Sequence, residues 1–452
     1  MDTSTILKKI SDPFVKLAER HYPDPFIFLI ILTALAFILA LTITDTNLVE
    51  ATIAWGNGLS GLLSFMTQIC LTLIAGHALA HTNLIQKILH RAAQIPQSEN
   101  QCYAWAAFIS GICTFISWAL GLVAGGLIAR HLAQVGHERN WKLHYPLIVA
   151  SAYSGFIVWH MGYSGSAPLF VATDGHSLQN LIGIIPVSDT IFSNWNLLTA
   201  TVIILIVSLI CSKMTPEKSK CQILNLNETE QRQEISDTYN LSLFNRLNNY
   251  HPLNIFLGTA VFFYIFLWFN YEKLSLNLNI VNWSFLAAGL LLANSPTHYA
   301  RLISNAVHTT SPILLQFPFY AAVMGLMTET GLVSIISNGF TTIATQETLP
   351  ILSFLSAGLI NLFIPSGGAQ WIVQGPIFLE AAANLGADPS IIVMSIAYGD
   401  QWTNMVQPFW AMPLLAIAGM QIRDIMGYTF IIFLVGFFVF GASVLFAPHL
   451  IQ

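Results

Sequence analysis

A run of polar residues interrupts the apolar sequence between Asn361 and Trp410, and its residue types could bind an ion and an organic anion. It begins NLFIPSGGAQWIVQGPIFLE and, after a short loop, continues IIVMSIAYGDQWTNMVQPFW. Lipid cannot satisfy bare amides or freed backbone groups, so such a segment is buried in protein or lines a wet cavity. Polar breaks at membrane depth are typical of transporter binding sites.

Asp400 lies inside an apolar, otherwise uncharged span, where an ionisable side chain is functional by default. It could carry a proton or bind another coupling cation, such as Na⁺. Gln401, Asn404 and Gln407 follow at spacings that place their amides along one helical face. Two structural alternatives stay open: Asp400 could simply bond a neighbouring hairpin, and the amides could only hold helices together.

A carboxylate substrate would meet no ammonium or guanidinium group here, because the span interiors contain no Lys or Arg. Free N–H groups at half-helix N-termini, with Ser, Asn and Gln side chains, would have to bind it. Two such half-helices are predicted to begin near Leu120–Gly121 and near Ala369–Gln370. A serine bonded back to its own helix, or a purely structural turn, is the alternative. The candidate substrate ligands at these breaks are Ser117, Ser366, Gly367, Gly368 and Gln370.

The segment IVWHMGYSGS contains His160, which could take up a proton near neutral pH or donate to an anion. A neutral histidine bonded to a backbone carbonyl is the alternative. Trp159 and Trp402 could wall a pocket for a short alkyl chain, or could simply pack in the core. The remaining candidates are Ser164 as a substrate ligand and Glu329 as a second coupling carboxylate.

The composition is that of a polytopic membrane protein. Of the 452 residues, 55% are hydrophobic and 9% charged, with a mean hydropathy of +0.64, whereas soluble globular proteins carry about 25% charged residues. The basic residues form no continuous patch, so nucleic acid is not an expected partner. His77 and His81 have metal-ligand spacing, but no acid or cysteine converges on them, and neither a metal nor another cofactor is predicted. The five cysteines imply no disulfide framework.

Uncharged apolar runs mark the membrane spans. They lie near 26–44, 61–86, 145–173, 193–212, 253–270, 281–294, 311–336, 389–419 and 427–448. Two more runs, 103–129 and 351–379, contain central breaks. If both enter and leave on one face and the N-terminus is cytoplasmic, 16 of the 17 Lys and Arg residues lie inside. This predicts about nine crossings and two re-entrant helical hairpins, with a periplasmic C-terminus.

The chain also contains an internal repeat. AYSGFIVWHMGYSGSAPL begins at Ala152 and AYGDQWTNMVQPFWAMPL at Ala397, and both start Ala-Tyr and end Pro-Leu at the same spacing. Upstream, FISGICTFISWALG resembles FLSAGLINLFIPSGG. An odd number of crossings separates the copies, so we predict an inverted repeat with two broken transmembrane helices and hairpins of opposite sidedness. Chance similarity between apolar segments is the alternative.

The predicted fold is therefore all-α and polytopic. No small-residue cleavage site follows the basic start of the chain, so no removable signal peptide is predicted. The predicted parts are a basic amphipathic cytoplasmic segment at 1–25, a first repeat at 26–212 with a hairpin at 103–130, a cytoplasmic linker at 213–250, and a second repeat at 251–448 with a hairpin at 351–383.

Three motifs together, VWHMGYSGSAPL, FIPSGGAQWIVQGP and YGDQWTNMVQPFWAMPLLAIAG, resemble the short-chain fatty acid transporter family, over essentially the whole chain. The resemblance implies uptake of short monocarboxylates, such as acetoacetate and butyrate, across the bacterial inner membrane. The layout is also similar to the wider ion-transporter superfamily, in which hairpin tips carry substrate and sodium and one domain slides against a scaffold. A homodimer is implied by that analogy alone.

We therefore expect a secondary transporter of short-chain monocarboxylates that works by alternating access and is not an enzyme. A dicarboxylate or amino-acid carrier is the nearest alternative, disfavoured by the lack of Lys and Arg in the spans. An intramembrane enzyme using His160 with Asp400 or a serine is a second, although neither Gly-x-Ser-x-Gly nor His-Glu-x-x-His occurs on these spans. A passive channel is a third, less suited to two gated hairpins. Sodium and proton coupling, and symport and exchange, all stay open.

Overall fold

The computed structural model describes residues 13–15, 20, 23–174, 176, 178–219, 221–224, 250–271 and 278–450. Within these ranges the regular structure is helical and no β-strand occurs. The all-α polytopic fold class is confirmed. Most of the predicted basic segment at 1–25 and of the linker at 213–250 lies outside the described residues, so both of those assignments stay predictions.

The first half has α2 (Pro25–Ile43) as its first described helix with given bounds. Its further helices are α3 (Leu48–Gly58), α4 (Leu63–Ala80), α5 (Asn83–Ala93), α6 (Glu99–Ile116), α7 (Trp118–Glu138), α8 (Tyr145–Ser154), the 3₁₀ helix η1 (Gly155–Met161), α9 (Ser166–Val171), α10 (Gln179–Ile182) and α11 (Asn194–Lys213).

The second half opens with the antiparallel pair α13 (His251–Asn270) and α14 (Leu278–Leu292). Its further helices are α15 (Pro296–Ala306), the 3₁₀ helix η3 (Val307–Thr310), α16 (Ser311–Glu329), α17 (Leu332–Thr341), α18 (Leu349–Asn361), α19 (Gly367–Leu385), α20 (Pro389–Thr403), α21 (Ala411–Ala418) and α22 (Ile422–Leu450).

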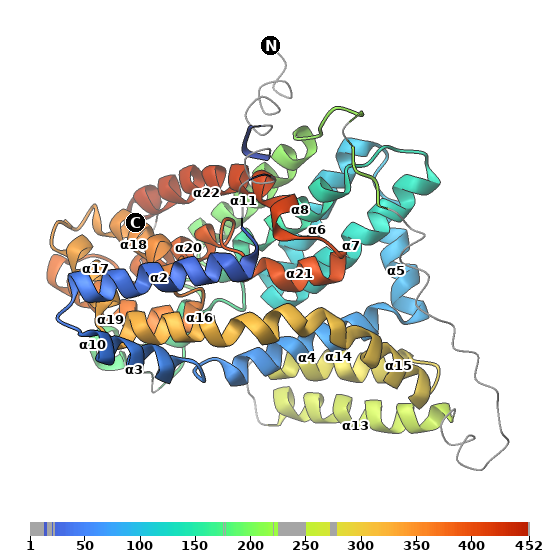
Figure 1. Ribbon diagram of the computed structural model, residues 1–452, viewed down its shortest axis with the longest axis horizontal. Helices are drawn as coiled ribbons and strands as arrows, with labels where there is room; N and C mark the ends of the chain where they lie inside the picture. Colours follow the sequence, from blue (N-terminus) through green and yellow to red (C-terminus); the bar gives the residue numbers. More distant parts are fainter. Residues whose placement is uncertain are drawn as a thin grey trace.

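Both halves contain the same sequence of elements. A long helix (α4, α16) is followed by a short one (α5, α17), a hairpin (α6–α7, α18–α19), a broken helix (α8–η1–α9, α20–α21) and a long helix (α11, α22). In each half the short helix packs on the second hairpin arm, and the first arm packs on the broken helix. In Figure 1, α2, α3, α4 and α16 run roughly parallel beside the hairpins and the broken helices. The orientation of the halves across a membrane stays a prediction.

Seven helical stretches are long and apolar enough to cross a membrane in the described part of the chain. Three of the nine predicted crossings are not among them: the runs at 145–173 and 389–419 are broken into shorter helices, and α14 has 15 residues. Conversely, α7 qualifies by length, although we predicted it to be one arm of a hairpin. Helix length alone therefore neither supports nor excludes the re-entrant assignment.

The broken helices form the centre of the molecule. All ten residues of α8 are buried, and so is every residue of α20 from Ser390 to Thr403. By contrast, only Asn254 and Gly258 are buried in α13, which exposes large apolar side chains such as Phe256 and Phe262. Such an outer face suits contact with lipid, because lipid tails are as apolar as these side chains.

Both hairpins turn where the sequence predicts a break, but their second arms begin earlier than expected. The first turn is a single extended residue, Ser117 (φ −157°, ψ 130°), so α7 begins at Trp118 and not near Leu120–Gly121. The second turn spans residues 362–366, and α19 begins at Gly367 and not near Ala369–Gln370. Ser164, from a different element, accepts the Trp118 N–H at 2.9 Å, which allows the helix to restart at once.

Candidate functional site

The two broken helices meet through a buried pair of ionisable side chains. His160 Nε2 in η1 lies 3.0 Å from Asp400 Oδ1 in α20, and the two side chains are 1% and 2% exposed. The partners are 240 positions apart, one in each half. The backbone N–H of His160 also donates to Gln401 Oε1 at 2.9 Å. Two side chains of α20 thus hold His160.

The surroundings of His160 fix which ring nitrogen carries the proton. The backbone N–H of Ser166 points to Nδ1 at 3.2 Å, and an N–H can only donate. Nδ1 is therefore an acceptor, so Nε2 carries the hydrogen and donates it to Asp400. In this arrangement the imidazole is neutral. A second proton could enter the ring only if Ser166 moved away from Nδ1.

Asn361, at the end of α18, ties the hairpin to the same region of α20. Its Nδ2 lies 2.8 Å from the Asp400 backbone oxygen, 2.9 Å from Thr403 Oγ1 and 2.8 Å from Asn404 Oδ1. Tyr153, in α8, donates its hydroxyl to the Asn404 backbone oxygen at 2.7 Å. The broken helix α20 is thus anchored to both halves.

Several buried polar atoms around the pair have no protein partner within the described residues. The acceptors are Asp400 Oδ2 and Asn361 Oδ1, and the donors are the side-chain amides of Gln401, Asn404 and Gln407. Buried polar groups are almost always hydrogen-bonded in folded proteins. These atoms are therefore free to bind water, an ion or a polar substrate.

The tip of the second hairpin contacts the His160 ring. A Cβ placed on Gly367 would overlap Cε1 and Nε2 of His160, so only glycine fits there. Gly368 faces open space, where a Cβ would meet no atom within 4 Å. Ser366 stands at the N-cap of α19 without capping it through its side chain. The first-turn amides of α19 therefore lie open at a helix N-terminus, which favours an anion.

The tip of the first hairpin borders a small cavity. Its volume is about 210 Å³, below the range of about 300–1,000 Å³ that is typical of drug-sized ligands. Ser166 also contacts the ionisable pair, since its N–H donates to His160 Nδ1. The cavity therefore adjoins the ionisable pair. Its lining residues are Ser117, Trp118, Tyr163, Ser164, Gly165, Ser166, Leu169, Leu278 and Val281.

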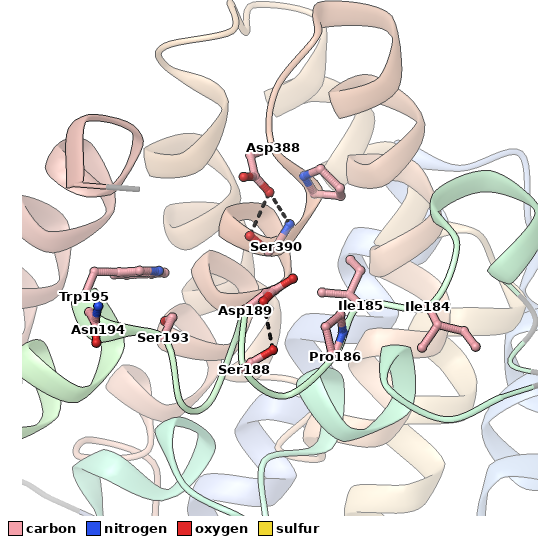
Figure 2. A pocket seen from close by; sticks show the side chains of 11 residues that line it. Ile184, Ile185, Pro186, Ser188, Asp189, Ser193, Asn194, Trp195, Asp388 and Ser390 are labelled. Carbon is pink, nitrogen blue, oxygen red and sulfur yellow. Dashed lines mark hydrogen bonds between the residues drawn. The ribbon is translucent and has the colours of Figure 1, made fainter. Parts of the chain in front are cut away.

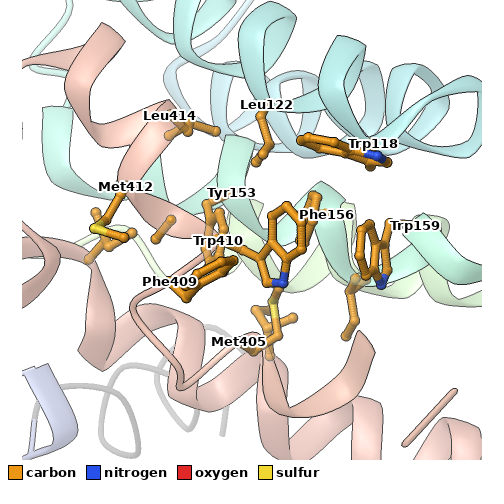
Figure 3. Close-up of a cluster of buried hydrophobic side chains, with 14 of the residues drawn as sticks. Trp118, Leu122, Tyr153, Phe156, Trp159, Met405, Phe409, Trp410, Met412 and Leu414 are labelled. Atoms are coloured by element: carbon orange, nitrogen blue, oxygen red, sulfur yellow. The ribbon is translucent and has the colours of Figure 1, made fainter. Parts of the chain in front are cut away.

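Trp159 belongs to an aromatic cluster next to the site (Figure 3). Its ring centroid lies 4.6 Å from that of Trp410, 6.1 Å from that of Trp118 and 4.0 Å from the His160 ring. Trp159 Nε1 and Trp410 Nε1 are both buried without a protein acceptor. The cluster joins α7, η1 and α21 and forms an apolar wall beside the polar atoms.

Three further predicted site residues have other partners in the structure. Trp402 packs on Phe433 and Phe354, and its Nε1–H donates to the Phe433 backbone oxygen at 2.7 Å, so it does not share a pocket wall with Trp159. Gln370 bonds Ala357 O and Gln374, which braces the two arms of its hairpin. Glu329 is exposed at the end of α16, where Asn57 Nδ2 lies 3.5 Å from it.

Two residues of this site were not among the predicted ligands. Ser166 closes the YSGS run that contains Ser164, and Asn361 opens the polar stretch that contains Asp400. Both were visible as polar residues beside a break. Their contacts with His160 and Asp400 depend on packing between segments far apart in the chain, which one sequence does not reveal.

A larger cavity lies at the N-terminal end of α20, away from the pair (Figure 2). It measures about 380 Å³ and is lined by Asp189 and Asp388, among others. Both carboxylates have local partners: Asp388 accepts from the N–H and the hydroxyl of Ser390, and Asp189 accepts from Ser188. Asp388 thus serves as the N-cap of α20. No group of three or more metal-ligating side chains occurs there or elsewhere in the described residues.

Comparison with known proteins places the whole chain in one family. The sequence profile of the short chain fatty acid transporter family matches residues 6–447. A protein of Escherichia coli (strain K12), provisionally named a short-chain fatty acid transporter, is 37% identical over 97% of this chain and 100% of its own length. A protein of Haemophilus influenzae (strain ATCC 51907 / DSM 11121 / KW20 / Rd) with the same name is 35% identical over 96% of this chain and 99% of its own.

Two solved transporters resemble the fold over nearly the full chain. MtrF of Neisseria gonorrhoeae, reported within a class of antimetabolite efflux pumps, is 15% identical, with a TM-score of 0.43 over 98% of this chain and 97% of its own. The YdaH transporter of Alcanivorax borkumensis is 13% identical, with a TM-score of 0.46 over 94% of this chain and 99% of its own.

Proposed function

This chain belongs to the short-chain fatty acid transporter family, and we propose that it takes up short monocarboxylates, such as acetoacetate and butyrate, by cation-coupled alternating access. The observation that carries the proposal is the His160–Asp400 pair, which joins the two halves at a fully buried point. A movement of one broken helix against the other must make or break this contact. The pair is therefore suited to link cation binding to conformation.

The charge of the pair explains why a cation is needed. The tautomer assigned above leaves His160 neutral, and no Lys or Arg forms an ion pair with Asp400 in the described part of the chain. A bare carboxylate at the centre of a membrane helix costs about 3 kcal/mol. A proton or Na⁺ on the unpartnered Asp400 Oδ2 would remove that cost. Asp400 is thus the proposed coupling residue, whereas Glu329 is exposed and lies beside Asn57.

The small cavity at the tip of the first hairpin suits a short monocarboxylate. The hydroxyl groups of Ser117, Ser164 and Ser166 supply donors for the carboxylate, and Ser166 also adjoins Gly367 at the start of α19. The aromatic cluster that contains Trp159 reaches this cavity through Trp118, which supplies an apolar surface for the alkyl chain. Because no guanidinium or ammonium group lines this cavity, one negative charge suits it better than two.

An intramembrane enzyme built on His160 is less compatible with these contacts. A nucleophilic serine would need its hydroxyl within hydrogen-bond reach of an imidazole nitrogen. Here Nε2 faces Asp400 and Nδ1 accepts a backbone N–H, so both ring nitrogens are already occupied. Bacterial inner-membrane location, a cytoplasmic N-terminus, a periplasmic C-terminus and a homodimer remain part of the proposal.

Uptake into proteoliposomes tests this function. Labelled butyrate and acetoacetate would be supplied outside, with sodium and proton gradients imposed separately. We expect one gradient to drive accumulation above the external concentration. Equilibration without accumulation under either gradient would argue for a channel or facilitator. Accelerated exchange with preloaded butyrate alone would argue for an exchanger, and no movement at all would reject the substrate class.

A further inference from the structure

A third cavity lies apart from the site described above. It measures about 660 Å³ and is bordered by α4, α7, α15, η3 and the end of α21. Helices α7 and α21 belong to the first hairpin and the second broken helix, whereas α4 and η3 lie outside both. The polar side chains that line it are His77, His81, Arg130, Asn305, His308 and Thr309.

The lining carries positive charge without a compensating acid. Arg130 is the charged residue of the cavity, three histidines accompany it, and no Asp or Glu is among the lining residues. One guanidinium nitrogen of Arg130 lies 3.4 Å from Ile417 O. This weak bond uses one of the five N–H donors of the group. Arg130 therefore keeps donors available for an anion.

His77 adds a second, independent feature. Its Nδ1 is buried and has no protein partner among the described residues. Its ring stacks on that of His81 with centroids 4.2 Å apart, and His81 Nδ1 lies 2.8 Å from His77 O. His81 is thus held in place by the backbone, while His77 keeps a nitrogen that can donate to a ligand. A carboxylate would satisfy both His77 and Arg130.

The position of the cavity in the fold assigns it to one end of the broken helix α20–α21. Arg130 follows Trp118 at the hairpin tip by 12 residues, or about 18 Å along α7. Leu224, from the predicted cytoplasmic linker, borders the cavity. The cavity at the start of α20 has the opposite sign, since Asp189 and Asp388 line it. Positive lining is therefore specific to one end of the broken helix.

We propose that the His77–Arg130 cavity is a binding site for small monocarboxylate anions at the cytoplasmic end of the protein, distinct from the site at the hairpin tips. One carboxylate oxygen would face the Arg130 guanidinium and the other the His77 Nδ1. In the proposed transport cycle, which this part of the inference presupposes, substrate leaving the hairpin tips occupies this site before release. The anion site itself does not depend on transport.

Charge-selective labelling tests the site without transport. Asn305 lines the cavity and is exposed, so Asn305→Cys on a Cys221→Ser background provides a reporter thiol. Its reaction rate would be measured with a negatively charged sulfonate thiosulfonate reagent and with a trimethylammonium analogue. We expect the anionic reagent to react faster, and the Arg130→Gln variant to lower the anionic-to-cationic rate ratio about fivefold. Sodium butyrate should slow the anionic reagent more than sodium chloride does at equal ionic strength.

Arg91→Gln is the matched control, because Arg91 is exposed on α5 and does not line the cavity. It removes the same charge from the same predicted face and should leave the ratio unchanged. If the anionic-to-cationic rate ratio does not change in Arg130→Gln, or falls by the same factor in Arg91→Gln, the proposed anion site is rejected. Equal slowing by butyrate and chloride overturns its preference for carboxylates.

A transport arm separates this inference from the proposed function. We expect Arg130→Gln to raise the KM for butyrate about threefold on the cytoplasmic side only, with kcat unchanged. Butyrate-sensitive labelling in a protein that moves no butyrate would reject the proposed function and keep the anion site. If the Arg130→Gln variant transports butyrate normally and its cytoplasmic KM is unchanged, the site has no role in substrate release.

Discussion

The two broken helices have the same backbone design but different chemistry. In the gapless alignment of the two repeat motifs, Asp400 corresponds to Gly155 and His160 to Met405. Each half therefore contributes one member of the buried pair, at positions that are not equivalent. The repeat supplies two breaks and one buried ionisable pair. The proposed coupling site is therefore a single one between the halves, rather than one in each.

The side-chain amides follow the same asymmetry. The three unpartnered side-chain amides beside the pair, those of Gln401, Asn404 and Gln407, all lie in the second half. The aligned positions in the first half hold two aromatic rings and a glycine. The aligned pairs are Gln401 with Phe156, Asn404 with Trp159, and Gln407 with Gly162. The second broken helix thus presents polar atoms, and the first presents an apolar wall and His160. Together they suit a ligand with a charged end and an apolar end.

The two hairpin tips also differ from each other. Ser164 accepts the first N–H of α7, and Trp118 packs among aromatic rings, so the first tip is closed. At the second tip, no side chain caps α19, and Gly367 lies against His160. We infer that the second tip responds directly to the state of the pair, whereas the first tip mainly shapes the substrate cavity.

The largest expected effect comes from Gly367→Ala. The added methyl group would overlap the His160 ring, and overpacking of this kind costs about 1–3 kcal/mol. We expect butyrate uptake to fall more than about tenfold. Gly368→Ala is the matched control, since its Cβ meets nothing within 4 Å, and it should change uptake less than about twofold. Equal uptake by both variants would contradict the view that the close contact between Gly367 and His160 is needed for transport.

Trp159 and Trp402 should respond differently to substitution by phenylalanine. Trp402→Phe loses the bond from Nε1–H to Phe433 O, which is worth about 1 kcal/mol, so thermal stability should fall with the KM for butyrate unchanged. Trp159→Phe loses no protein hydrogen bond and should raise that KM about threefold with little effect on stability. Thermal melting in detergent and initial uptake rates measure both effects. The reverse pattern would place Trp402 in the site.

The serines of the two tips provide a smaller contrast. Ser366→Ala should weaken the apparent affinity for butyrate about threefold and leave stability unchanged, because this hydroxyl caps no helix. Ser164→Ala should also lower stability by about 1 kcal/mol, because it removes the cap on Trp118 N–H. Uptake kinetics and melting of the two variants would be compared. Unchanged kinetics in Ser366→Ala would exclude that serine from the site.

The smallest effect is a pH dependence outside the spans. Burial lowers the pKa of His144 from 6.5 to about 4, and its Nδ1 accepts the N–H of Gln222 at 3.0 Å. Because the folded state has the lower pKa, the stabilising contribution is complete above pH 6.5 and is lost as the pH falls toward 4. We expect a loss of about 0.8 kcal/mol between pH 7.5 and pH 6. Thermal melting of the His144→Gln variant should not show this loss between pH 7.5 and pH 6. A pH profile identical to that of the wild type would contradict the prediction.

The sequence was sufficient to predict the breaks and their repetition. Pro365 and the two glycines after Ser366 mark the second tip, and the structure turns between residues 362 and 366. Apolar length and breaks depend on local composition, so a single sequence reveals them. The start of α7 was placed too late because Ser164, from another element, caps it.

The arrangement of the site could not be predicted in the same way. His160 and Asp400 were both candidates, but their contact joins residues 240 positions apart. Gln370 was expected to bind substrate because it is a polar residue at a break in an apolar run, yet it bonds Ala357 O inside its own hairpin. An amide at membrane depth serves equally well as a ligand or as a brace, and only packing distinguishes the two roles.

The central claim is that Asp400 couples the cation to the movement of the halves, and Asp400→Asn tests it most directly. Accumulation of labelled butyrate under an imposed cation gradient and exchange against preloaded butyrate would be measured in the same proteoliposomes. The amide is neutral and still accepts the hydrogen bond from His160 Nε2, so the fold and the substrate site should persist. We predict that accumulation is lost and exchange is retained. Equal loss of both, or accumulation at the wild-type level, would contradict the coupling role.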